Sequence, residues 1–125
     1  MNRAISIFFT TVFLSLSLLC LPDVEASGTW MPTGSMAEPR RDHRAALMND
    51  GRVLVVGSST AEIYDPASGV FGPAGDMIFG HGTYPTATIL ADDRVLITGG
   101  TSDGTSAEVY DPASGTFFST GPMHD

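Results

Sequence analysis

An eleven-residue stretch occurs twice in this chain, with nine identical positions. AEIYDPASGVF begins at Ala61 and AEVYDPASGTF begins at Ala107, 46 residues later. The similarity continues on both sides of this stretch. The further segments that match are 49–58 with 92–100, and 30–36 with 71–77 and 117–123, the last three ending in Gly-x-Met. A repeat with a period of 20–50 residues predicts an architecture of stacked, similar units.

Each unit predicts four short antiparallel strands, at 44–48, 52–57, 61–64 and from 70 onward, and at 87–90, 94–100, 107–110 and from 116 onward. The strongest evidence is the Asp-Pro-Ala-Ser-Gly turn that follows each third strand. Asp65 and Asp111 open this turn by accepting a hydrogen bond from the backbone. Pro presets φ for the next corner, and Gly69 and Gly115 take the positive φ that returns the chain to the sheet. Each turn therefore predicts a hairpin.

The second strands are apolar at every position, as VLVV (53–56) and VLI (95–97). This pattern is typical of strands that are buried on both faces. A four-stranded sheet of this kind needs a neighbour on each side, which predicts blades of a β-propeller. A β-sandwich remains open from the strand count alone, although a sandwich does not require the repeat. The predicted divisions are an N-terminal strand segment at 27–36 and blades at 37–77 and 78–123.

The order of these motifs resembles the kelch repeat, as in secreted bacterial kelch proteins and the central propeller of galactose oxidase-like proteins. The similarity covers residues 30–123. The kelch signature is a double glycine, a tyrosine and a later aromatic residue. In the first unit Ser58 stands in place of the second glycine, which predicts a differently shaped turn. The residues that the repeat and the resemblance mark as structural are Gly57, Tyr64, Asp65, Gly69, Phe71, Gly99, Gly100, Tyr110, Asp111, Gly115 and Phe117.

Two blades are fewer than the four to eight of a typical propeller. One explanation is that the chain is the first part of a larger ring, in which segment 30–36 completes the last blade. Propellers often use an N-terminal strand in this way. The other is self-association, in which three copies of two blades form a six-bladed ring. Some small lectins resemble such an assembly. We favour the larger ring.

The first residues predict a cleaved secretory signal peptide, 1–26. They combine a short positive start, a long apolar run, and Val24 and Ala26 at the spacing of a cleavage site. An uncleaved membrane anchor and a lipoprotein attached through Cys20 are alternatives, and Leu19 before that cysteine disfavours the second. The expected location is therefore secreted or periplasmic. Cleavage after Ala26 would leave a chain without cysteine.

The charge of residues 27–125 limits the partners. This part has five arginines, no lysine and twelve acidic residues, a formal net charge of −7. Such a surface argues against nucleic acid and anionic membranes. The expected partner is a protein or a carbohydrate, with a homo-oligomer possible if the chain is not part of a longer one.

The sequence predicts no catalytic residue, no cofactor and no metal ligand. The histidines at 43, 81 and 124 do not recur at one repeat position, whereas metal sites need clustered ligands. The copper chemistry of galactose oxidase-like proteins uses a tyrosine joined to a cysteine, which residues 27–125 lack. A speculative ligand loop is FGHGTY (79–84), with His81 and Tyr84. We expect a binding scaffold rather than an enzyme; the alternative is the N-terminal part of an enzyme with catalytic residues beyond residue 125.

Overall fold

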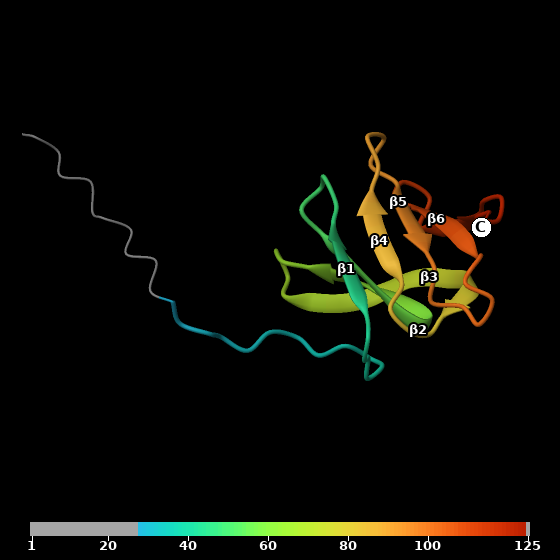
Figure 1. The fold of residues 1–125 in the computed structure, drawn as a ribbon. Helices are drawn as coiled ribbons and strands as arrows, with labels where there is room; N and C mark the ends of the chain where they lie inside the picture. Colours follow the sequence, from blue (N-terminus) through green and yellow to red (C-terminus); the bar gives the residue numbers. More distant parts are fainter. Residues whose placement is uncertain (1–27, 125) are drawn as a thin grey trace, which may run out of the picture. The chain divides into compact units, whose positions relative to one another are not determined.

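In the computed structural model, which describes residues 28–124, the chain folds into two antiparallel β-sheets, and this range contains no helix (Figure 1). The contacts divide the chain between Trp30 and Met31, and both sheets belong to the second unit. Blade 1 has the order β1-β2-β3 and blade 2 the order β4-β5-β6-β7. The strands are β1 Arg44–Leu47, β2 Val53–Asp65, β3 Val70–His81, β4 Thr86–Ile89, β5 Val95–Thr98, β6 Ala107–Asp111 and β7 Thr116–Ser119. The all-β prediction is confirmed, and the predicted signal peptide lies outside the described residues.

The Asp-Pro turns form as predicted. The Ala67 and Ala113 amides each donate to the Oδ1 atom of the aspartate two residues before, at 2.9 Å. Gly69 and Gly115 have φ values of 70° and 68°, in the left-handed region that favours glycine. The two turns therefore fix the hairpins β2–β3 and β6–β7 in the same way.

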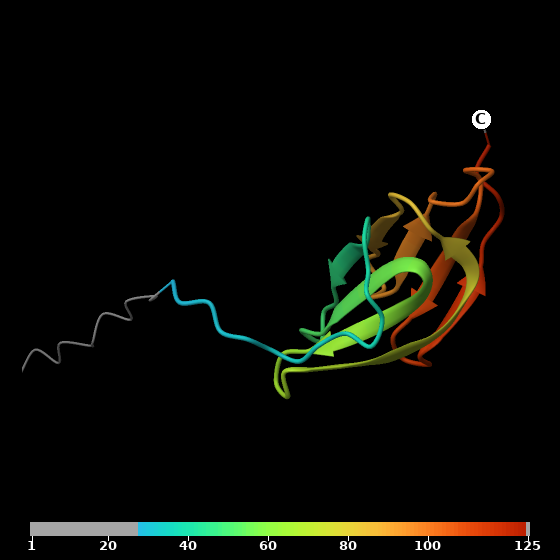
Figure 2. The same ribbon diagram turned by 90° about the horizontal axis from the view of Figure 1, so that it is seen from below.

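Blade 1 differs from the prediction of four separate strands. Its second and third predicted strands lie within one continuous strand, β2, which turns back on itself in a tight bend near Ser58–Thr60 (Figure 2). The bend stays within the sheet because Ser58 pairs with His81 and Thr60 pairs with Asp76 on β3. In blade 2 the corresponding connection is four residues longer and leaves the sheet, so β5 and β6 are separate.

The predicted N-terminal strand is not a strand, because residues 28–36 have no ladder of hydrogen bonds. The segment makes one backbone hydrogen bond to blade 1, from the Gly34 amide to the Gly69 carbonyl at 2.8 Å. The Thr33 hydroxyl also lies 2.7 Å from the Tyr64 hydroxyl. One backbone bond positions a segment but does not make it part of a sheet.

The hydrophobic core lies between the two blades, where β1 packs beside β4 and β3 continues along β7 (Figures 1 and 2). Blade 1 contributes aliphatic side chains and blade 2 adds two aromatic rings. The buried members are Ala46, Met48, Leu54, Val56, Ala61, Ala74, Val95, Ile97, Tyr110 and Phe117. Side chains alternate along a strand, so the neighbours of these residues face away from the core.

Candidate functional site

Each blade contains a buried glutamate at the same position of the repeat. Glu62 on β2 is 5 % exposed and Glu108 on β6 is 0 % exposed. A buried carboxylate is costly unless a cation or several hydrogen-bond donors compensate it. In both blades these partners come from the segment that leads into the first strand of the sheet, β1 or β4, which we call the innermost strand of the blade.

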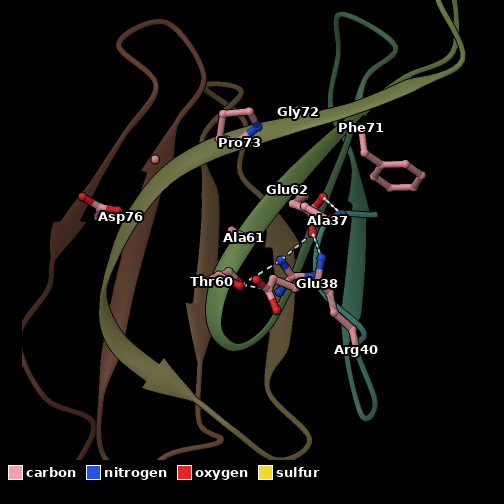
Figure 3. Close-up of a pocket in the computed structure, with 11 residues that line it drawn as sticks. Ala37, Glu38, Arg40, Thr60, Ala61, Glu62, Phe71, Gly72, Pro73 and Asp76 are labelled. Carbon is pink, nitrogen blue, oxygen red and sulfur yellow. Dashed lines mark hydrogen bonds and ion pairs between the residues drawn. The ribbon is translucent and has the colours of Figure 1, made fainter. Parts of the chain in front are cut away.

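In blade 1 the cation is Arg40. Its Nη2 atom lies 2.9 Å from Glu62 Oε1, and its side chain is 1 % exposed. Its Nη1 atom donates to the carbonyl oxygen of Thr60 (Figure 3) and also to that of Gly57, on the other side of the bend in β2. Arg40 therefore joins the bend of β2 to the glutamate of the same strand.

Burial raises the pKa of the Glu62 carboxyl, but hydrogen bonds outweigh this effect. The Ala37 amide donates to Glu62 Oε2 at 2.9 Å, and the Arg40 guanidinium and the Glu38 amide donate to Oε1. The pKa of Glu62 is consequently lower than its ordinary value. The carboxylate is ionised, and both of its oxygens accept hydrogen bonds from groups within the blade.

In blade 2 the corresponding partner is a histidine. His81 Nε2 lies 3.0 Å from Glu108 Oε1, and both side chains are 0 % exposed. The two atoms are at ion-pair distance without the alignment of a hydrogen bond. His81 Nδ1 contacts the carbonyl of Gly99, the repeat counterpart of Gly57, and the Ile78 amide donates to Glu108 Oε2 at 2.9 Å. A carbonyl only accepts hydrogen bonds, so Nδ1 carries a proton.

The prediction that His81 belongs to a ligand-binding loop is therefore wrong. Phe79–His81 are the last residues of β3, and the His81 ring is enclosed between β3, the end of β5 and β6. A fully buried ring, with Nδ1 against a carbonyl and Nε2 3.0 Å from a carboxylate oxygen, has no surface to offer a ligand. Of the two predicted ligand residues, only Tyr84 is exposed, at 69 %.

A pocket of about 280 Å³ lies beside the Arg40–Glu62 pair (Figure 3). Its apolar wall includes Ala61, Phe71 and Pro73, and Glu38 and Asp76 add carboxylates. Figure 3 places Phe71 and Asp76 at opposite ends of the pocket. Because the arginine and the buried glutamate bind each other and the backbone, this pocket offers a ligand mainly its apolar wall and its outer carboxylates.

A second candidate surface lies where the innermost strands begin. At their other ends, the Asn49 amide donates to Asp93 Oδ1 at 2.9 Å, so β1 and β4 run side by side in the same direction (Figure 1). The loops before them, 41–43 and 82–84, therefore share one rim; we call them the rim loops. Asp42 and Tyr84 have φ values of 55° and 51° at the same repeat position. A left-handed conformation is uncommon for a tyrosine.

The predicted structural residues occupy equivalent places in the two blades. The Tyr64 and Phe71 ring centroids are 4.9 Å apart, and those of Tyr110 and Phe117 are also 4.9 Å apart. Ser58 stands in place of the second glycine and has a φ of 61°. Its counterpart in blade 2, Gly100, has a φ of 78°, in the same left-handed region. The bend of blade 1 therefore keeps the glycine-like conformation without the glycine.

Over residues 28–124, no three histidine, cysteine or acidic side chains are grouped closely enough to hold a metal ion. The described part of the chain also has no helix of the length and apolarity that crossing a membrane requires.

Comparisons with known proteins support the fold. No family model matches the chain, and no curated protein matches it in sequence. Among solved structures it is similar to a fungal alcohol oxidase of the AA5 family in complex with copper, with a TM-score of 0.59 and 22 % identity. The match covers 70 % of this chain and 20 % of the oxidase chain, so this chain spans about a fifth of its length. At this identity the likeness concerns the fold: the two sheets are blades of a β-propeller.

Proposed function

We propose that this chain is part of an exported kelch-type β-propeller that binds a protein or carbohydrate ligand through its rim loops. The observation that carries the proposal is the exposed Tyr84, held in a left-handed conformation on a rim that the two blades share. Binding residues are often found on loops that a rigid scaffold positions. The kelch order of motifs supports the kind of propeller, and the N-terminal signal pattern supports export.

The charges of the rim loops fit this role. Arg41 in the first rim loop and Arg44 at the start of β1 are both exposed, in a chain with a formal net charge of −8. Arg40, in contrast, is buried in blade 1 and paired with Glu62. Exposed guanidinium groups bind carboxylates, and a tyrosine ring packs against the apolar face of a sugar or a peptide side chain. A ligand with both kinds of group suits this surface.

Binding of residues 27–125 to a panel of immobilised oligosaccharides and acidic peptides tests the proposal. We expect at least one class to bind, and Tyr84→Ala or Arg41→Ala to weaken that binding at least tenfold. Arg94→Ala is the matched control, because Arg94 is also exposed and lies near the opposite rim. Equal binding by the Tyr84 and Arg94 variants would contradict a role for the rim loops.

A second candidate is the N-terminal part of an oxidase, with catalytic residues beyond residue 125. The likeness to the fungal alcohol oxidase motivates this candidate, although that likeness covers a fifth of the oxidase. The coding DNA beyond codon 125 tests it. Further blades with clustered tyrosine, cysteine and histidine residues on one face would favour the oxidase, and a stop codon would remove it.

A further inference from the structure

Blade 1 has an apolar face directed away from blade 2. Ala46 and Ile63 pack in or against the core between the blades, so their strand neighbours Leu47 and Tyr64 face the other way. Phe71 stacks on Tyr64, and we call Leu47, Tyr64 and Phe71 the Tyr64 face. Leu47 is 66 % exposed, and both rings are half-buried. This face corresponds to the surface of blade 2 that blade 1 covers.

Residues 31–36 cover part of the Tyr64 face, in the position of an outer strand. Their repeat counterparts, 72–77, belong to β3 and lie against blade 2. The steric evidence is the same at both places. A Cβ atom added to Gly34 would lie 2.6 Å from the Gly69 carbonyl oxygen, and one added to Gly75 would lie 2.6 Å from the Gly115 carbonyl oxygen. The two segments therefore occupy equivalent positions.

Residues 31–36 make fewer stabilising contacts with blade 1 than residues 72–77 make with blade 2. Thr33 and Met31 are exposed, whereas Ala74, the counterpart of Thr33, is 2 % exposed and lies in the core. The polar contacts are the Gly34 amide bond and the hydroxyl of Thr33. Arg40 and the Ala37 amide hold the next residues through Glu62, so the segment can leave without unfolding the blade.

Blade 2 ends with a segment of the same kind. Residues 117–123 repeat the Gly-x-Met pattern of 30–36, with Gly121 in the place of Gly34. A Cβ atom on Gly121 would meet nothing within 4 Å in this structure. Phe118, next to the buried Phe117, is 51 % exposed on the face of blade 2 that points away from blade 1.

We propose that residues 31–36 occupy the place of an outer strand exchangeably, and that residues 117–123 of a second copy can take this place on blade 1, so that copies join head to tail. In the new contact, blade 2 of the second copy packs on blade 1 of the first copy. This packing is the same as that of blade 1 on blade 2 within one chain. While residues 31–36 stay bound, they exclude the second copy. The proposal rests on the blade arrangement and not on the ligand of the rim loops.

The test measures the mass of residues 27–125 by light scattering over a range of concentrations. We expect the unsubstituted chain to be a monomer. Gly34→Val drives its Cβ atom into the Gly69 carbonyl, ejects residues 31–36 and tightens association at least tenfold. In the double variant Gly34→Val, Gly121→Val, the valine that arrives from the second copy meets the same carbonyl, so association is lost.

Gly121→Val alone is the folding control, because its surroundings are open; it should keep the melting temperature of the unsubstituted chain. A chain that starts at Met36 repeats the test if Gly34→Val does not fold. A monomeric Gly34→Val variant, or a double variant that associates as strongly as the single one, overturns the proposal. Loss of association with ligand binding through Tyr84 intact would leave the proposed function standing.

Discussion

The two blades contain the same tyrosine–phenylalanine pair in different surroundings. The ring centroids are 4.9 Å apart in both, with interplanar angles of 43° and 48°. Tyr110 and Phe117 are 1 % and 8 % exposed, whereas Tyr64 and Phe71 are half-buried. The hairpin fixes the geometry of the pair, and the neighbouring blade determines its burial. The geometry of the aromatic pair is therefore set within each blade, whereas the burial that stabilises the pair depends on the neighbouring blade.

The buried glutamates extend this comparison. Both blades direct a basic side chain onto a glutamate and onto the carbonyl of an equivalent glycine. This side chain is Arg40 in blade 1 and His81 in blade 2. An arginine offers a planar guanidinium with five N–H donors, whereas a histidine offers two ring nitrogens. The same connection is thus made by groups of different chemistry.

The largest expected effect is on the aromatic pairs. Tyr110→Ala leaves a cavity between the blades and should lower the free energy of unfolding by about 3–5 kcal/mol. Tyr64→Ala removes a half-buried ring and should cost roughly half as much. Urea unfolding of the two variants measures the difference. Equal losses would show that blade 2 does not depend on the cover that blade 1 provides.

A smaller effect is expected from acid. The pKa of Glu62 is lowered from its ordinary value of 4.5. Its contribution to stability is therefore complete above that value and is lost as the pH falls through the lower, folded pKa. Glu62→Gln should reduce the change in urea midpoint between about pH 5 and pH 3. Glu38→Gln, an exposed glutamate next to the same pocket, is the matched control, and an unchanged pH slope in Glu62→Gln would refute the assignment.

The smallest effect concerns the bend of blade 1. Ser58 has a φ of 61°, which a glycine adopts without strain, so Ser58→Gly should raise stability by about 1 kcal/mol or less. Ser59→Gly, at the next position with ordinary φ, should lower stability by about 0.5–1 kcal/mol. Thermal unfolding distinguishes the two. A loss in both variants would mean that the bend of blade 1 is not strained at Ser58.

The sequence predicted the parts of the fold that depend on local rules. The Asp65 and Asp111 turns, the strands around them and the packing of similar sheets follow from turn chemistry and from the repeat. Residues 28–36 do not form the predicted N-terminal strand, because the partner expected for it is a last blade of the ring, which residues 28–124 do not contain. The joining of two predicted strands into β2 was missed, since the sequence does not show that the bend near Ser58 stays paired with β3.

The buried ion pairs were also missed, although the sequence contains a signal for one half of them. Glu62 and Glu108 are charged residues at the same place in two otherwise apolar strands, which marks a buried carboxylate. Their partners carry a weaker signal, because Arg40 and His81 each follow the Met of Gly-x-Met by four residues but are different residue types. Only the path of the chain into each innermost strand brings them to the glutamates.

The longer connection between β5 and β6 has a practical consequence for protein engineering. Residues 101–106 extend this loop by four residues relative to blade 1, and the ring distance in the adjoining hairpin is the same as in blade 1. The blade thus absorbs added length at this point without changing its frame. Peptides grafted between Thr101 and Ser106 would be displayed on a scaffold whose geometry is set elsewhere.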